Sequence, residues 1–441
     1  MSDIPTLIRF VLSIYQLKRV CRDRGSGLLV QRAGKLPLEG IRVVEFSHMV
    51  MGPSTGTILG DLGADVVKVE PVGGDHTRRL LGSGSGYFPM FNRNKRSICL
   101  DLKSAEGLAV AIRLVNGADV VVENFRPGAL EKLGLGPDAF RTSNPGLVYC
   151  STKGFLTGPY EHRSALDEVA QMMGGLAYMT GPTGRPLRAG ASVIDIAGGM
   201  FGAIGILAAL LARTHDGEGA MVRASLFETT AFMVGQHMAQ MAVTGQAARP
   251  MPERISAWAI YDVFETADPA ELLFVGVVSD GQWQNFIKAF DLGPIGNDPR
   301  LATNNERVQA RDVIVPVVRR IMAASSRADL LVRLEAAGVA FAPIARPEDL
   351  FDDPHLNANG GLLDLTLNDG RPIRLPALPL EINGAIPGVR HDLPHPGGDS
   401  EAVLRDFGFT DAEVAGLLQS RTIMANATAS ASRTPEHKRA S

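Results

Sequence analysis

The feature that most constrains the fold is the alternation of short apolar strands with helix-forming segments in the first third of the chain. "IRVVEF" (41–46) and "ADVVKVE" (64–70) have the length and β-branched content of buried strands. The segment between them is rich in Gly and small residues and is predicted to form a helix from about Ser54 to Leu62. Two such strands joined by a helix form a βαβ unit, so we predict an α/β protein.

The same alternation continues along the chain. Strands are expected at 97–102, 118–125 and 146–155, with helices at 104–116 and near 129–133. This spacing predicts a doubly wound, mostly parallel sheet. Residues 196–212 are nearly all apolar or small, which indicates a buried helix.

The rest of the chain predicts a large domain interrupted by a smaller one. Apolar strand and helix patterns in the second half indicate a smaller α+β region, and the proline-rich stretch 371–398 looks like an extended return segment followed by closing helices. The predicted parts are a helical N-terminal extension (1–36), the first part of the large domain (37–235), a small domain (236–350), a return segment with closing helices (351–420), and a disordered tail (421–441).

Composition excludes several classes of protein. The net charge is -3 and no basic cluster resembles a nucleic-acid surface, so no nucleic-acid partner is expected. The apolar stretch "IPTLIRFVLSIYQL" is interrupted by Arg9 and is shorter than the roughly 20 residues of a membrane span. We therefore expect no membrane span and interpret this stretch as an amphipathic helix that docks on the body or on a partner, with membrane-surface association as the alternative.

Cysteine usage and sequence motifs narrow the choice of cofactor. Cys21, Cys99 and Cys150 are far apart and show no Cys-x-x-Cys spacing, so neither a disulfide framework nor a zinc site is indicated, and a cytoplasmic location is expected. Glu70 ends the second strand where an acid could bind a ribose hydroxyl. The preceding turn, "SHMVMGPSTG", lacks the G-x-G-x-x-G pattern, which disfavours NAD binding.

One carboxylate stands out. "GASVIDIAGGM" (190–200) places Asp195 at the end of an apolar run and directly before a helix-like stretch, with no Lys or Arg within several residues. An Asp in this position most often caps the helix, a role worth about 1 kcal/mol. An unpaired carboxylate among apolar residues can also act as a nucleophile.

Polar segments follow several predicted strands. In a doubly wound sheet the carboxyl ends of the strands converge on the ligand site, so Asn124, Arg126 and Lys153 are predicted to share a crevice. The turn "FNRNKRS" (91–97) offers cationic donors for phosphate groups, and a solvated basic turn is the alternative interpretation. These donors are Arg93, Lys95 and Arg96.

Five segments, in order, resemble the family III CoA-transferases of the CaiB/BaiF type, which include carnitine CoA-transferases and α-methylacyl-CoA racemases. The resemblance runs from about Pro37 to about Gln419. It implies a Rossmann-like large domain, a smaller domain, and an interlocked dimer of two ring-shaped subunits. The segments are "LEGIRVVEFSHMVMGP", "LGADVVKVEPVGGDHTR", "FNRNKRSICLDLKSAEG", "ADVVVENFRPGALEKLGL" and "GASVIDIAGGMFGAIGILAALLAR".

The resemblance implies a function for Asp195. This residue matches the family's nucleophilic aspartate, which forms an anhydride with the acyl group of an acyl-CoA and then a thioester with CoA. Asp167 is expected to orient substrate or its own loop, a plain surface acid being the alternative. Backbone N–H groups near Gly198 and Gly199 are expected to stabilise an oxyanion. CoA thioester and carboxylic acid are the implied substrates, and no tightly bound cofactor or metal is implied.

The resemblance also implies a set of CoA-binding residues and a mode of assembly. A homodimer is expected, with a hetero-oligomer containing a paralogue as the alternative. The CoA-binding residues would be His48, Met49, Asn92, Arg93, Lys95, Asn124, Phe125, Lys132 and Lys153.

Two other functions fit the same scaffold. A racemase would use the aspartate as a base opposite a histidine, but this chain has Leu166 at the histidine position, and losing one acid/base group costs about a hundredfold or more in rate. A catalytically silent subunit would lack the nucleophile, whereas Asp195 is present. Val50, where some oxalate-using members carry glutamine, and the lack of a tetraglycine loop after residue 235 disfavour a formyl-CoA/oxalate specificity.

Overall fold

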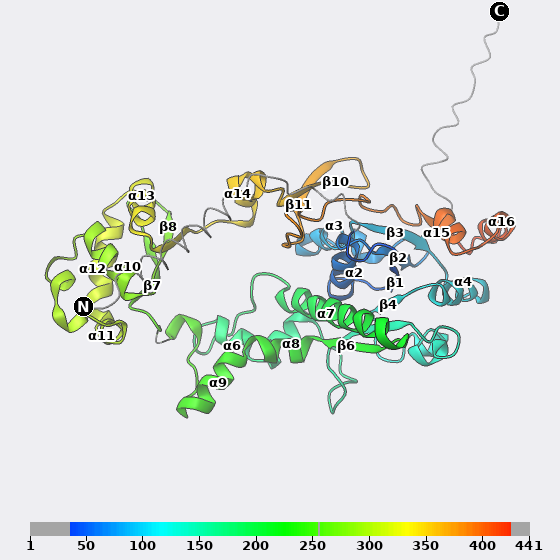
Figure 1. Cartoon of the computed structure of the whole chain (residues 1–441), viewed down its shortest axis with the longest axis horizontal. Helices are drawn as coiled ribbons and strands as arrows, with labels where there is room; N and C mark the ends of the chain where they lie inside the picture. The colour runs from blue at the N-terminus through cyan, green and yellow to red at the C-terminus, as the bar shows by residue number, and fades with distance from the viewer. Residues whose placement is uncertain (1–35, 255, 425–441) are drawn as a thin grey trace, which may run out of the picture. The chain divides into compact units, whose positions relative to one another are not determined.

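The computed structural model describes residues 36–254 and 256–424. The predicted N-terminal helix and disordered tail lie almost entirely outside these residues. The described chain forms two compact units (Figure 1). The second unit comprises Tyr178–Leu187 and His237–Leu356, and the first holds the rest. The second unit resembles the predicted small domain 236–350, with an added segment before Asp195 that the sequence pattern did not indicate.

The first unit is built on a six-stranded sheet in which every pairing is parallel, as predicted. The strand order is β3-β2-β1-β4-β5-β6, so the direction in which strands are added reverses between β1 and β4. Ligands of such sheets bind outside the carboxyl ends of the strands at this reversal. The strands are β1 (Arg42–Phe46), β2 (Asp65–Glu70), β3 (Lys95–Cys99), β4 (Val120–Glu123), β5 (Val148–Lys153) and β6 (Met221–Ser225).

Helices cover both faces of this sheet, because alternate residues of each strand point to opposite faces. Val43 belongs to a core that includes residues of α2 (Met51–Asp61) and α7 (Val193–Asp216). The next residue, Val44, belongs to a second core with α4 (Ala105–Asn116), α15 (Ser400–Asp406) and α16 (Asp411–Gln419). Two apolar layers explain why the strands read as continuous hydrophobic runs.

Helix α7 begins three residues earlier than the predicted start at Ile196. By length and composition it is the one helix of the described chain that could cross a membrane. It packs on α2 and β5, however, and several of its residues lie in the core of the first unit (Figure 1). Burial in a sheet-flanking core therefore accounts for the apolar residues on one side of α7, whereas Met200, Ile204 and Leu211 are exposed.

The return segment 371–398 leads back to the first unit. Part of it forms β11 (Pro372–Pro376), which pairs antiparallel with β10 (Leu362–Thr366). Further on, the Arg390 guanidinium donates hydrogen bonds to the carbonyl oxygens of Gly60 at 2.6 Å and Ala64 at 2.9 Å. The other helices of this unit are short: α3 (Tyr87–Met90), α5 (Asp167–Met173), α6 (Leu176–Thr180), whose residues from Tyr178 onward belong to the second unit, and α8 (Leu226–Met233).

The second unit is an antiparallel three-stranded sheet packed with helices. Its strand order is β7-β8-β9, and its core is closed by Trp283, Phe286 and Phe290. This is the predicted α+β character. The elements are β7 (Ile260–Glu265), β8 (Leu272–Val277), β9 (Ala340–Pro343), α9 (Gly235–Thr244), α10 (Asp280–Ala289), α11 (Asn304–Gln309), α12 (Arg311–Ala323), α13 (Arg327–Ala337) and α14 (Pro354–Ala358).

Candidate active site

The loops after β1 and β4 meet at the point where the strand order reverses. The Asn124 side chain accepts a hydrogen bond from the His48 N–H at 3.0 Å and donates one to the His48 carbonyl oxygen at 2.8 Å. The His48 ring lies 5.4 Å from the Phe125 ring, measured between centroids. Three of the predicted CoA-binding residues are therefore neighbours at the edge where doubly wound sheets bind ligands.

Met49 completes this edge in a left-handed backbone conformation, with φ of 63°. Such a φ is uncommon for a residue with a side chain, so surrounding contacts must hold it. The Met49 N–H donates to Thr77 Oγ1 at 3.1 Å, and the neighbouring His48 backbone is held by Asn124. Burial lowers the pKa of His48, which favours the neutral imidazole at this edge.

Lys153 ends β5, beside β4. Its Nζ donates to the Phe125 carbonyl oxygen at 2.7 Å and lies 2.6 Å from Glu123 Oε1. Burial raises the pKa of Glu123. Lys153 keeps 15% of its side chain exposed, and Lys132 is exposed in the short 3-10 helix Glu131–Leu133. Lys132 is therefore the more accessible cation, whereas Lys153 is paired with Glu123 and mostly covered.

The structure places the predicted CoA-binding residues Asn92, Arg93 and Lys95 in the protein interior. All three are buried, with at most 2% of each residue exposed. Arg93 pairs with Asp61 at 2.6 Å and Lys95 with Glu45 at 2.8 Å. Asn92 precedes β3, donates to the Phe88 carbonyl oxygen and accepts from Lys95 Nζ. Internal carboxylates pair with both cations in the described structure, and neither cation is exposed to solvent.

Beneath α2 these pairs form a buried charge cluster that the sequence analysis missed. Lys68 lies 3.5 Å from Glu45 and 3.2 Å from Asp75. A Cβ on Gly56 would lie 1.7 Å from Glu45 Oε2, so glycine is required there to make room for the carboxylate. Burial lowers the pKa of Lys95 to about 8. The sequence did contain a sign of this cluster, because the apolar strands β1 and β2 each include a charged residue, Glu45 and Lys68.

Asp195 lies in the first turn of α7, and Ser192 occupies the N-cap position. Asp195 is therefore not the N-cap residue of α7, which was the alternative interpretation of its position. Instead Asp167, the buried first residue of α5, accepts hydrogen bonds through Oδ2 from the backbone N–H groups of Ile194 at 2.9 Å and Asp195 at 3.1 Å. Because a carboxylate from another helix satisfies these N–H groups, the Asp195 side chain is not needed as a cap.

The Asp195 carboxyl has a strongly perturbed ionisation. Burial and, next, the negative charge of Asp167 raise its pKa to about 7, while Arg188 acts in the opposite direction. No ion pair within 4 Å links Asp195 to any residue that the structure describes. A carboxylate that is costly to ionise and lacks a close cation is a candidate nucleophile or base.

Arg188 is a residue that sequence reasoning missed. Its guanidinium lies 3.5 Å from Asp167 Oδ1 and 2.6 Å from Glu168 Oε1. The side-chain amide of Gln171 donates a hydrogen bond to the same Asp167 oxygen at 2.5 Å, measured from Nε2 to Oδ1. Arg188 precedes Asp195 by only seven positions in "RAGASVID", but a turn and not a helical spacing brings it close.

Gly198 and Gly199 have a packing role that differs from the expected one. They lie in the second turn of α7, where α-helix geometry pairs each N–H with the carbonyl four residues earlier. A Cβ on Gly199 would lie 2.0 Å from Ser54 Oγ, and one on Gly198 would lie 2.5 Å from Met51 Cε. These glycines let α7 approach α2 closely.

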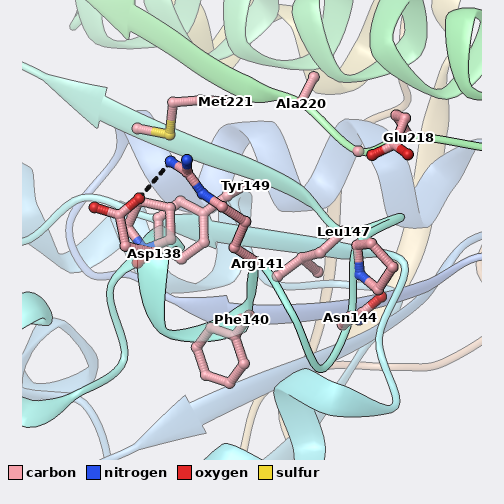
Figure 2. Close-up of a pocket in the computed structure, with 12 residues that line it drawn as sticks. Asp138, Phe140, Arg141, Asn144, Leu147, Tyr149, Glu218, Ala220 and Met221 are labelled. Carbon is pink, nitrogen blue, oxygen red and sulfur yellow. Dashed lines mark hydrogen bonds and ion pairs between the residues drawn. The ribbon is translucent and has the colours of Figure 1, made fainter.

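A separate cavity of about 240 Å³ opens at the amino ends of β5 and β6. Figure 2 shows Tyr149 and Met221 in it, together with the ion pair between Arg141 and Asp138 at 2.6 Å. Asn124 and Lys153 lie at the carboxyl ends of their strands, where doubly wound sheets bind ligands. The cavity at the amino ends therefore lies on the opposite side of the sheet. It contains none of the predicted site residues.

The fold and the arrangement of the residues around Asp195 can now be compared with known protein families. A model of CoA-transferase family III matches residues 38–400. The chain belongs to this family and is a CoA-transferase.

Particular relatives agree with this classification. The chain is 36% identical over 375 residues to the succinate–glutarate CoA-transferase of Agrobacterium fabrum, covering 82% of this chain and 93% of the relative. It is 33% identical to the acetyl-CoA:oxalate CoA-transferase of Acetobacter aceti, covering 82% and 91%. The crystal structure of a CaiB/BaiF family protein from Brucella suis is similar with a TM-score of 0.74 and 32% identity, covering 85% of this chain and 100% of that one.

Proposed function

We propose that the enzyme moves CoA from an acyl-CoA to a free carboxylic acid through covalent intermediates on Asp195. The Asp195 carboxylate attacks the thioester carbonyl carbon, the C–S bond breaks, and CoA leaves as a thiolate, which gives an acyl-aspartyl anhydride. The thiolate then attacks the Asp195 carbonyl carbon and releases the donor acid, which leaves an aspartyl-CoA thioester. The acceptor carboxylate reverses these two steps and departs as the new acyl-CoA.

The environment of Asp195 carries this proposal. Its carboxyl is partly buried, its pKa is raised to about 7, and the Asp167 carboxylate fixes the backbone on which it stands. A partly desolvated carboxylate is more reactive than a hydrated one, and limited access of water protects an anhydride from hydrolysis. Asp167 is a positioning residue in this scheme.

The CoA moiety is proposed to bind at the edge formed by the loops after β1, β4 and β5. This edge offers the neutral His48 ring, the Phe125 ring and the exposed Lys132. Met49, Asn124 and Lys153 shape it. A cation paired with a phosphate and rings packed on an adenine are the contacts that such a set can supply.

Short dicarboxylic acids are the proposed acyl groups. Succinate and glutarate appear in the name of the Agrobacterium fabrum relative. The reaction is proposed to need no tightly bound cofactor, because the carboxylate and the thioester supply the chemistry.

The assembly is proposed to be a homodimer in the cytoplasm. Helix α7 leaves Met200, Ile204 and Leu211 exposed at helical spacing, and an apolar face of this kind is typical of a protein interface. Cys99 and Cys150 are unpaired thiols, which fits a reducing compartment. A monomer measured by light scattering at micromolar concentration would contradict the proposed homodimer.

The test is intact-protein mass spectrometry after incubation with a panel of acyl-CoA thioesters, comparing wild type with Asp195→Ala. We expect an adduct on wild type that maps to Asp195, is removed by hydroxylamine, and is absent from the variant. Exchange of the α-proton with deuterated water without any adduct would instead support the racemase. CoA binding without either reaction would support a silent subunit.

A further inference from the structure

Two carboxylates lie within 4 Å of the Arg188 guanidinium, next to the start of α7. Arg188 pairs with Glu168 and approaches Asp167, and its charge acts on Asp195. The Asp167 carboxylate bridges the two ends of this arrangement, because one oxygen faces Arg188 and the other accepts the Asp195 N–H. One carboxylate group therefore separates the guanidinium from the backbone of the proposed nucleophile.

We propose that Arg188 binds the distal carboxylate of a dicarboxylic acyl group while the other carboxyl carbon of that group reacts at Asp195. Arg188 would thus select dicarboxylic over monocarboxylic substrates. The inference rests on the proposed function, since it assigns a specificity residue to the same reaction.

The present partners of Arg188 leave it available for a ligand. Glu168 is 55% exposed and the Arg188 side chain is 33% exposed, so their ion pair is screened by water and contributes little to stability. Asp167 does not depend on Arg188, because it keeps the hydrogen bonds from Ile194, Asp195 and Gln171. A substrate carboxylate can replace Glu168 without leaving a buried charge unpaired.

The charge balance of the reaction also favours a distal carboxylate. Acylation converts the Asp195 carboxylate into a neutral anhydride and removes one negative charge near Arg188. A dicarboxylic acyl group brings one negative charge back, whereas a monocarboxylic group brings none. The planar guanidinium fork suits a carboxylate in two-point contact, which a lysine ammonium cannot reproduce.

The experiment compares two donors that differ at the far end of the acyl chain. Succinyl-CoA carries a terminal carboxylate where butyryl-CoA carries a methyl group. The measurement is kcat/KM for CoA thiol release in the presence of hydroxylamine, which captures the acyl group of the anhydride. The variants are Arg188→Gln and Arg188→Lys. The matched control is Arg141→Gln, which removes another solvent-exposed, ion-paired arginine at the opposite edge of the sheet (Figure 2).

We expect wild type and Arg141→Gln to prefer succinyl-CoA. Arg188→Gln should lose about tenfold to a hundredfold in kcat/KM for succinyl-CoA, the range for a charge-assisted hydrogen bond, and keep its kcat/KM for butyryl-CoA. Arg188→Lys should fall between the two. The wild-type preference tests the proposal even if a variant fails to fold.

Two results would overturn the inference while leaving covalent transfer intact. One is wild-type acylation of Asp195 that does not distinguish the two donors. The other is an equal loss for both donors in Arg188→Gln, which would make Arg188 structural. Failure of every thioester in the panel to modify Asp195 would instead overturn the proposed function and this inference together.

Discussion

The Asp167 carboxylate accepts a hydrogen bond from the backbone N–H of Asp195 at 3.1 Å. Asp167 therefore holds in place the helix terminus that carries Asp195. The two negative charges also oppose each other, and Asp167 contributes to the raised pKa of Asp195. One contact therefore fixes the position of Asp195 and tunes its ionisation. Two residues distant in sequence become a functional pair only through the packing of α5 against α7.

The acylation rate is expected to follow the ionisation of Asp195. Since its pKa is raised to about 7 and only the carboxylate attacks, the rate should rise with pH through about 7 and level off above it. The measurement is the initial rate of hydroxylamine-trapped acylation from pH 5 to 9. A flat profile over this range would contradict the assignment of Asp195 as the nucleophile.

Asp167→Asn is expected to move the midpoint of that profile to lower pH. The substitution removes the like charge that helps to raise the Asp195 pKa but keeps an oxygen acceptor for the helix N–H groups. Asp167→Ala also removes the acceptor, and should cost about 1 kcal/mol in the free energy of unfolding. An unchanged midpoint in Asp167→Asn would show that the Asp167 charge does not contribute to the raised pKa of Asp195.

Asp195→Asn is expected to stabilise the protein at alkaline pH. The folded-state pKa of about 7 lies above the ordinary value of 3.8, so the folded state binds more protons than the unfolded state between these values. Wild-type stability from this group therefore falls as pH rises through that window. The Tm of the variant should exceed that of wild type by a few °C at pH 8, and by less at pH 5.

Lys95→Ala is expected to lower stability, whereas Lys132→Ala is expected to weaken CoA binding and leave stability almost unchanged. Removing Lys95 leaves the buried Glu45 with the hydrogen bond from Ser47 and only the longer ion pair to Lys68, which should cost about 3–5 kcal/mol in the free energy of unfolding. Removing the exposed Lys132 should change stability by less than about 0.5 kcal/mol and weaken CoA binding. Urea unfolding and CoA titration distinguish these outcomes, and a stable Lys95 variant with weak CoA binding would restore the phosphate-binding interpretation.

The sequence by itself determined the sheet and drew attention to Asp195. Continuous apolar strands separated by helices of suitable length fit a parallel sheet covered on both faces, and periodicity carries this information locally. The strand alternation from 41 to 155 gave the correct class, and the apolar helix containing Asp195 was recognised with a start three residues too late. A carboxylate without a neighbouring cation was also visible in the sequence alone.

Only the tertiary structure decided which charges are buried and which side chains they pair with. By residue type alone, Arg93 and Lys95 do not differ from surface cations. Their burial depends on Asp61 and Glu45, which lie more than 30 positions away. Likewise Arg188 and Asp167 acquire their roles because a turn and two helix termini meet beside Asp195. A residue type reports the charge that a side chain carries, whereas long-range packing sets its solvation and its partners, and these determine whether it binds, reacts or stabilises the fold.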